Sequence, residues 1–162
     1  MKLSTKGRYA MVALADLARR AADAGHTSTT SLAEISRRQD VSLPYLEQLF
    51  VKLRRAGLVE SVRGPGGGYR LSRAASDIRV SDVLEAVDET VSALHTGAGA
   101  SGGGSGSPEQ ALTTRLWESL SANVYVFLHQ TRLSDVVADE LTPCPAVPNL
   151  LAIVDEVDTV DS

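Results

Sequence analysis

The chain contains one cysteine in 162 residues and no run of about 18 consecutive apolar residues. A single thiol excludes an internal disulfide and suits a reducing compartment. The missing apolar run argues against a membrane-spanning helix, and the N-terminal segment MKLSTKGRYA lacks the apolar centre of a signal peptide. These absences predict a cytoplasmic protein without a membrane partner.

Recognisable catalytic groupings are also missing. The sequence offers no Ser/His/Asp set, no paired acids in a pocket motif and no cluster of metal ligands with regular spacing. We therefore expect a protein that is not an enzyme.

Basic residues are scarce in the second half of the chain. Residues 81–162 hold 2 Lys and Arg against 13 Asp and Glu, a net charge of −11, whereas residues 1–80 hold 14 against 7, a net charge of +7. A basic half joined to an acidic half is expected when a nucleic-acid-binding domain is fused to a domain that does not bind nucleic acid. The alternative is that the arginines only solvate helix faces.

Residues 31–57 predict two short helices joined by a tight turn. Ser31 and Glu34 have the S-x-x-E spacing of a capping box, which places the start of the first helix. Ser42 can cap the second helix, and Pro44 lies in its first turn, where a missing N–H group costs no hydrogen bond. The second helix has an inward apolar stripe: Leu46, Leu49, Phe50 and Leu53. Its outward positions are Tyr45, Glu47, Gln48 and Lys52. This arrangement is typical of a recognition helix in a DNA major groove.

The residues after Gly57, as far as Tyr69, predict a strand, a glycine-rich tip and a second strand, which form a hairpin that follows these helices as a wing. Its tip, GPGGG, begins at Gly64 and includes Gly66 and Gly67, which let the backbone approach another surface without Cβ clashes. Arg63 stands at the base of the tip, within reach of a minor groove or a phosphate. An ordinary hairpin loop is the alternative, and neither phosphate-binding glycine motif fits this segment.

Two further helices flank this region on the N- and C-terminal sides. Residues 4 to about 24 carry one apolar stripe, and Lys6 and Arg8 crowd the helix start, where N–H groups already favour phosphate. After the wing, Ser81 is expected to cap a helix that ends near Glu89.

Residues 96–110 are low-complexity Gly, Ser and Ala, a composition that buries too little apolar surface to order itself.

A longer helix is expected from about Leu112. Its apolar residues cover much of the circumference and include Leu116, Leu120, Val124 and Phe127. Such a helix on a small domain needs a partner, which favours a homodimer; the alternative is that it folds back on its own domain. Ser134 is expected to cap a last short helix. The domains predicted are a winged-helix domain at 1–80, a linker helix, sensing-type loop and dimerisation helix at 81–140, and a loosely ordered tail at 141–162.

Four segments together resemble a known family. They are STKGRYA at 4–10, VSLPYLEQLFVKLRRAGLVESVRGPGGGYRL at 41–71, VSDVLEAVDETV at 80–91 and LTTRLWESLSANVYVFL at 112–128. They resemble the iron–sulfur cluster regulators (IscR-like) of bacteria. The resemblance implies a mainly α-helical protein with a small β-wing: a winged helix–turn–helix domain that binds a double-stranded DNA operator, and a long dimerisation helix.

The resemblance also implies roles for particular residues. Recognition-helix and wing residues are expected to contact DNA: Ser42, Tyr45, Glu47, Gln48, Arg63, Gly64, Gly66 and Gly67. Lys6 and Arg8 are expected to contact phosphates. Pro44 stands where the family commonly has a serine, so one hydroxyl contact is missing.

The sensing loop departs from the family pattern. Members carry three cysteines between the AVDE helix and the long helix, with a histidine just before the tryptophan. Here residues 95–110 contain no cysteine, and Thr114 occupies the histidine position. The loop is either an engineered cysteine-free version or a natural variant that has lost or rebuilt the site. In a rebuilt iron–sulfur site the candidate ligands are Cys144, His95 and His129, and a dimer can share one cluster through two copies of Cys144. The alternative for Cys144 is a solvated thiol in the tail, and the alternative for His129 is a residue on the helix surface.

These observations predict a dimeric repressor of iron–sulfur assembly or iron homeostasis genes that senses an atypically ligated cluster. Two alternatives remain: an effectorless winged-helix repressor, and a winged-helix protein-interaction scaffold without specific DNA binding. A haem sensor, suggested by the dipeptide Cys144-Pro145, is more distant.

Overall fold

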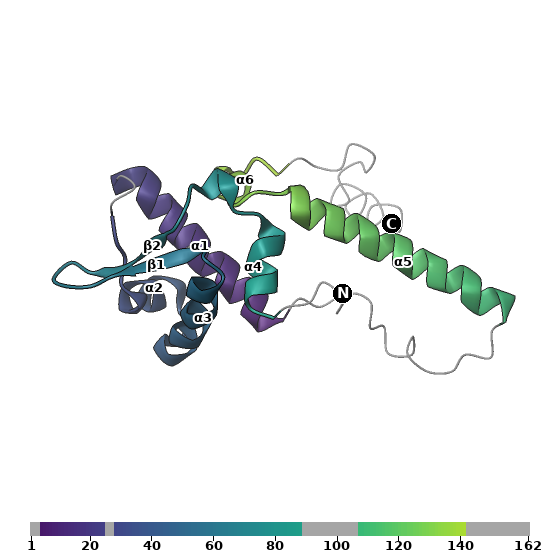
Figure 1. The fold of residues 1–162 in the computed structure, drawn as a ribbon, viewed down its shortest axis with the longest axis horizontal. Helices are drawn as coiled ribbons and strands as arrows, with labels where there is room; N and C mark the ends of the chain where they lie inside the picture. Colours follow the sequence, from purple (N-terminus) through teal and green to yellow (C-terminus); the bar gives the residue numbers. More distant parts are fainter. Residues whose placement is uncertain (1–3, 25–27, 89–106, 142–162) are drawn as a thin grey trace, which may run out of the picture.

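The computed structural model describes residues 4–24, 28–88 and 107–141 and is mainly helical, with one two-stranded antiparallel sheet (Figure 1). The elements in chain order are α1 (Thr5–Ala24), α2 (Leu32–Gln39), α3 (Leu43–Arg55), β1 (Val59–Val62), β2 (Gly68–Leu71), the 3-10 helix η1 (Ala75–Asp77), α4 (Val80–Ala86), α5 (Pro108–Gln130) and α6 (Leu133–Ala138). This is the fold class predicted from the sequence, a helical protein with a small β-wing and a long helix. In the described segments no helix has the length and apolar character needed to cross a membrane.

The core is built around α1, which packs against α2, β2, α4 and α6. The inward stripe predicted for α3 is confirmed, since all four of its residues are buried. Phe50 from this stripe is the largest fully buried side chain among the described residues, and Leu14 of α1 is also fully buried. The same cluster includes Val83 of α4 and Leu133 of α6, so the elements that follow the wing share one core with those that precede it.

The predicted starts of α2 and α3 are confirmed. The Ser31 hydroxyl oxygen accepts a hydrogen bond from the Glu34 N–H group at 3.3 Å, and the Glu34 carboxylate accepts one from the Ser31 N–H group at 2.8 Å. These two bonds form the capping box. At α3 the Ser42 hydroxyl oxygen accepts from the Tyr45 N–H group at 3.3 Å.

Three other predicted helix starts were wrong. Ser81 lies buried inside α4, and Ser134 is the second residue of α6. In both helices the start is fixed by a carboxylate, because Asp82 accepts from the Arg79 N–H group and Asp135 accepts from the Arg132 N–H group. The long helix begins at Pro108 rather than near Leu112. Proline suits a first helical position because the N–H group it lacks has no partner there.

An isolated antiparallel bridge between Thr30 and Tyr69 attaches the wing to the segment that precedes α2. Thr30 and Tyr69 exchange two backbone hydrogen bonds of 2.9 and 2.8 Å. A Cβ atom at Gly68 would lie 2.6 Å from the Thr30 backbone, so this close approach requires glycine. The Tyr69 ring then meets Phe50 edge-on, with 4.8 Å between ring centroids. The hairpin is thereby coupled to the core beneath α3.

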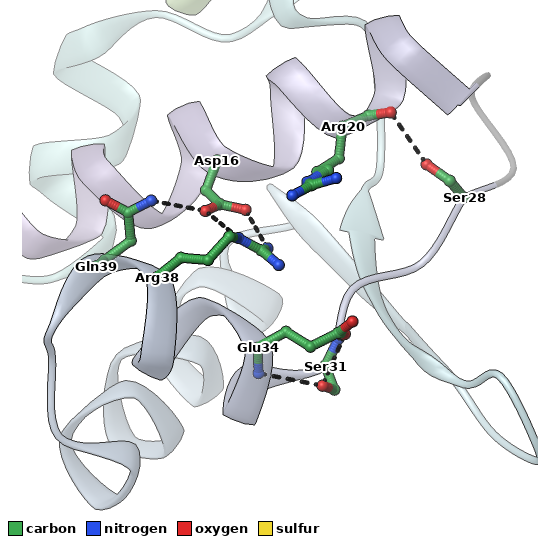
Figure 2. A network of polar contacts seen from close by, with 7 residues as sticks. All are labelled: Asp16, Arg20, Ser28, Ser31, Glu34, Arg38 and Gln39. Atoms are coloured by element: carbon green, nitrogen blue, oxygen red, sulfur yellow. Dashed lines mark hydrogen bonds and ion pairs between the residues drawn. The ribbon is translucent and has the colours of Figure 1, made fainter.

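The angle between α1 and α2 is held by a buried carboxylate. Figure 2 shows Asp16 of α1 facing Arg38 and Gln39 at the end of α2. Arg38 Nε and Nη2 donate to the two Asp16 oxygens at 3.0 and 2.5 Å, and Gln39 Nε2 donates at 2.7 Å. Burial raises the pKa of Asp16, but these hydrogen bonds and the charge of Arg38 outweigh it, so the pKa lies below the ordinary value of 3.8. We call Asp16, Arg38 and Gln39 the α1–α2 clamp.

Replacing Asp16 by asparagine is expected to lower the free energy of unfolding by about 2–3 kcal/mol at neutral pH, because it removes one partner of a buried ion pair. The estimate is kept below the full buried-pair value because the Arg38 side chain is 24% exposed and can recover water. Since the folded-state pKa is lowered, the carboxylate stabilises the fold above pH 3.8 and this contribution is lost as the pH falls through the folded pKa. Denaturant unfolding of both proteins as a function of pH measures the difference.

Asp23→Asn is the matched control, since Asp23 is an exposed acid on the same helix. We expect that control to unfold like the unmodified protein. A deficit for Asp16→Asn that stays constant into strong acid would contradict the role assigned to the Asp16 charge.

Candidate nucleic-acid interface

The exposed face of α3 carries the side chains expected to read DNA. Ser42, Glu47 and Gln48 are all exposed. Tyr45 is only half-buried rather than fully outward, because its ring packs edge-on against Tyr9 of α1 with 5.8 Å between centroids. Glu47 and Gln48 thus offer a carboxylate and an amide on the exposed face of α3, groups that hydrogen-bond to base edges.

Lys52 points toward another helix instead of being free on the outer face of α3. Its Nζ lies 2.5 Å from Asp88 Oδ2, at the end of α4. The hydrogen bond from Lys52 is the main reason that the pKa of Asp88 lies below its ordinary value. This contact ties the C-terminal half of α3 to the segment that leads out of α4.

The tip of the wing is built by three glycines with different roles. Gly64 and Gly66 have φ values of 104° and 76°, a region that residues with a Cβ rarely adopt. A Cβ at Gly67 would lie 2.4 Å from the Val62 carbonyl oxygen. The turn is closed by a 2.8 Å hydrogen bond from the Gly67 N–H group to the Gly64 carbonyl. Arg63, just before the tip, is exposed.

Exposed basic side chains lie on both α1 and α3. Lys6 and Arg8 are exposed in the first turns of α1, and Arg54 and Arg55 are exposed at the end of α3. Figure 1 shows α2, α3 and the hairpin at the end of the molecule opposite to the free end of α5. Cations of this kind contact phosphates, while the polar residues of a recognition helix read bases.

Helix α5 extends away from the other helices (Figure 1) and carries exposed large apolar side chains. Trp117 is 59% exposed and Leu116 58% exposed, and five more large hydrophobic side chains of the described part of α5 are more than two-fifths exposed: Leu112, Leu120, Tyr125, Val126 and Phe127. An apolar surface of this extent on one helix marks an interaction site.

The expected cluster ligands are not brought together in the part of the chain that the structure describes. Residues 4–24, 28–88 and 107–141 contain no group of three or more His, Cys, Asp or Glu side chains arranged to hold a metal ion. Cys144 and His95 lie outside the described residues. His129 faces Arg79 and Ser81, so it can bind a metal only by releasing those partners.

Two contacts that shape this interface were not predicted. The α1–α2 clamp joins residues 22 positions apart, and the contact between Arg79 and His129 joins residues 50 positions apart. The only local signal was an acidic residue on the apolar face of α1, at Asp16, and it does not name a partner.

Comparison with known proteins agrees with this geometry. A model of the Rrf2 family, described as an iron-dependent transcriptional regulator, matches residues 3–139. The HTH-type transcriptional regulator IscR of Cereibacter sphaeroides is 72% identical over 156 residues, which cover 96% of this chain and 99% of the relative. The protein of the same name from Vibrio atlanticus is 50% identical over 141 residues, covering 86% and 76%.

A solved structure, T. potens IscR, superposes with a TM-score of 0.66 at 33% identity and covers 94% of this chain and 96% of the other. These relatives are named transcriptional regulators rather than enzymes, as the sequence predicted. With its helix–turn–helix, its wing and a family match over most of its length, the chain belongs to the Rrf2 family of DNA-binding transcriptional regulators.

Proposed function

We propose that the protein is a homodimeric, sequence-specific repressor of genes for iron–sulfur cluster assembly or iron homeostasis. The observation that carries this proposal is the pairing of an exposed polar α3 with a glycine-built wing tip, in a chain 72% identical to a regulator named IscR. In this proposal Glu47 and Gln48 read base edges, with Ser42 and Tyr45 at the start of the helix. Lys6 and Arg8 bind phosphates, while Arg63 and the glycine tip enter a neighbouring groove.

Dimerisation through α5 supports operator recognition. Two copies that bury the apolar surface of α5 against each other would hold two α3 helices in a symmetric pair. A palindromic operator then presents half-sites about one DNA turn, or roughly 34 Å, apart. The exposed fractions of Leu116, Trp117 and Phe127, all above one half, support this partner over a helix that folds back on its own body.

The effector in this proposal is an iron–sulfur cluster held by Cys144 with His95. The protein acts in the cytoplasm in this proposal. The family description as iron-dependent supports the iron–sulfur effector. The described residues do not form a ligand set by themselves. In this proposal the thiolate ligand comes from Cys144, the chain's single cysteine. An effectorless repressor is the second candidate, and the observation that favours it is the absence of the loop cysteines from the sequence.

Base reading by Glu47 is tested by replacing it with alanine. We expect discrimination between operator and mismatched duplexes to fall by about 1–3 kcal/mol, while affinity for unrelated DNA stays within a few fold. Fluorescence anisotropy titrations on a panel of single-base operator variants measure both quantities. Glu85→Ala, an exposed acid on α4, is the control. A uniform loss over all sequences would show that Glu47 does not read a base.

Cluster binding is tested by replacing Cys144 with alanine. Anaerobically purified protein is expected to carry a visible absorption band with iron and sulfide, and the variant is expected to lose all three because thiolates hold cluster iron. A colourless unmodified protein that still binds its operator would support the effectorless repressor instead. If the unmodified protein binds its operator no more tightly than unrelated DNA, the result would favour a winged-helix protein-interaction scaffold.

A further inference from the structure

Within the described residues, a short backbone bridge ties the end of helix α5 to the winged-helix part of the protein. The Val80 N–H group donates to the Thr131 carbonyl at 3.0 Å, and the Leu133 N–H group donates to the Ile78 carbonyl at 2.9 Å. These bonds pair Arg79 with Arg132 as an isolated antiparallel bridge. The bridge begins just after α5 ends at Gln130, so it fixes the connector and leaves the direction of the helix to other contacts.

A side-chain brace sits beside this bridge, on the last turn of α5. Arg79 Nη1 is hydrogen-bonded to His129 Nε2, and His129 Nδ1 lies 3.4 Å from the Ser81 hydroxyl. Because arginine only donates, the histidine nitrogen that faces it is the unprotonated acceptor. Tyr125, one turn earlier on α5, stacks on the His129 ring with 5.6 Å between centroids and 18° between planes.

The brace connects α5 to the start of α4, an element that belongs to the core. Arg79 immediately precedes α4, and Ser81, inside the helix, is 1% exposed. Val83 and Val87, on the same short segment, pack in the core with Leu14 and Phe50. The brace therefore ties the last turn of α5 to an element that is fixed in the core.

Small changes at this junction become large at the far end of α5. The helix has 23 residues and a length of about 34 Å, so a rotation of about 10° at its base displaces its other end by about 6 Å. One base-pair step along DNA is about 3.4 Å. A rotation of this size therefore corresponds to one or two base pairs.

We propose that the brace formed by Arg79 and His129 sets the angle between α5 and the DNA-binding body, and thereby the half-site spacing that the dimer accepts. This inference rests on the proposed dimerisation through α5. Arg79 and His129 are positioning residues here, since they act on DNA only through the placement of α3 in the two subunits.

The test uses a palindromic duplex selected from a random pool by the unmodified full-length protein, together with duplexes whose central spacer is one or two base pairs longer or shorter. Affinities are measured for the unmodified protein, His129→Ala, Arg79→Met, the double variant and Gln130→Ala. Gln130 is an exposed neighbour on the last turn of α5 and serves as the control. A single half-site duplex reports the intrinsic affinity of the winged helix.

We expect the unmodified protein and the control to lose about tenfold in affinity, or more, on a one-base-pair change of spacer. His129→Ala and Arg79→Met are expected to reduce this discrimination to about threefold or less, with half-site affinity unchanged. The double variant is expected to resemble each single variant, because the two residues form one contact.

A sharp spacing preference retained by both single variants would overturn the inference and leave the proposed function intact. Such retention together with a lowered melting temperature would assign the brace to stability alone, which also overturns it. An unmodified protein that binds only as a monomer would overturn the proposed dimeric function, and the inference with it.

Discussion

Replacing Leu116 and Leu120 of α5 together by glutamate is expected to convert the protein to a monomer and to lower its affinity for a palindromic operator by at least about 100-fold. Their side chains are 58% and 50% exposed on the described chain, next to the 59% exposed Trp117. Two buried carboxylates without partners would oppose pairing of the helices. Without pairing of the helices, the subunit that binds the second half-site must come from solution rather than from the same dimer, which lowers the affinity. Sedimentation velocity and anisotropy titration measure the two effects.

The control for this double variant is Leu141→Glu, which adds one charge at an apolar residue that is 45% exposed and lies outside α5. A single half-site duplex should bind the double variant as it binds the unmodified protein, since α3 and the wing are unchanged. A double variant that remains dimeric at micromolar concentration would show that α5 is not the dimer contact.

Replacing Gly67 by alanine is expected to lower operator affinity by about tenfold. The new Cβ would lie 2.4 Å from the Val62 carbonyl oxygen and 2.7 Å from the Gly64 carbonyl oxygen. Both contacts are with backbone, so the turn itself must change shape. The hairpin tip would no longer present Arg63 and its glycines to the groove in the same way.

Ser61→Ala is the matched control for the wing, because Ser61 is exposed on β1 and its substitution adds no atom. Its affinity should equal that of the unmodified protein. The core should remain intact in Gly67→Ala, since the tip lies outside it, and the unfolding free energy should fall by no more than about 1–2 kcal/mol. Unchanged operator binding by Gly67→Ala would show that the wing tip does not contact DNA.

The features that could be predicted from the sequence are those determined by residues that lie close together along the chain. The capping box of Ser31 and Glu34 is complete within four residues, and the α3 stripe repeats at helical spacing. The two mistaken caps show the limit of such patterns. The usual preference for serine as a cap predicts Ser81 and Ser134 at the starts of α4 and α6. In the structure the residues that mark these starts are Asp82 and Asp135, each three positions after the true cap.

The remaining structure depends on contacts between residues far apart in sequence. Two such contacts are the clamp between Asp16 and Arg38 and the bridge between Thr30 and Tyr69. They form only when the chain folds, and the spacing of apolar residues in the sequence does not predict them. The sequence predicts His129 as a candidate ligand or a surface side chain and does not predict the brace, because a single histidine does not reveal an arginine 50 positions away. These contacts fix the angles between elements.

The most direct test of the account is an affinity measurement over a range of salt concentrations, on a selected operator and on a scrambled duplex of the same length. A sequence-specific regulator of this design is expected to bind the operator at least about 1,000-fold more tightly at physiological salt, and both affinities should fall as salt releases phosphate contacts. Equal affinity for the two duplexes at every salt concentration would contradict sequence-specific recognition by α3 and the wing.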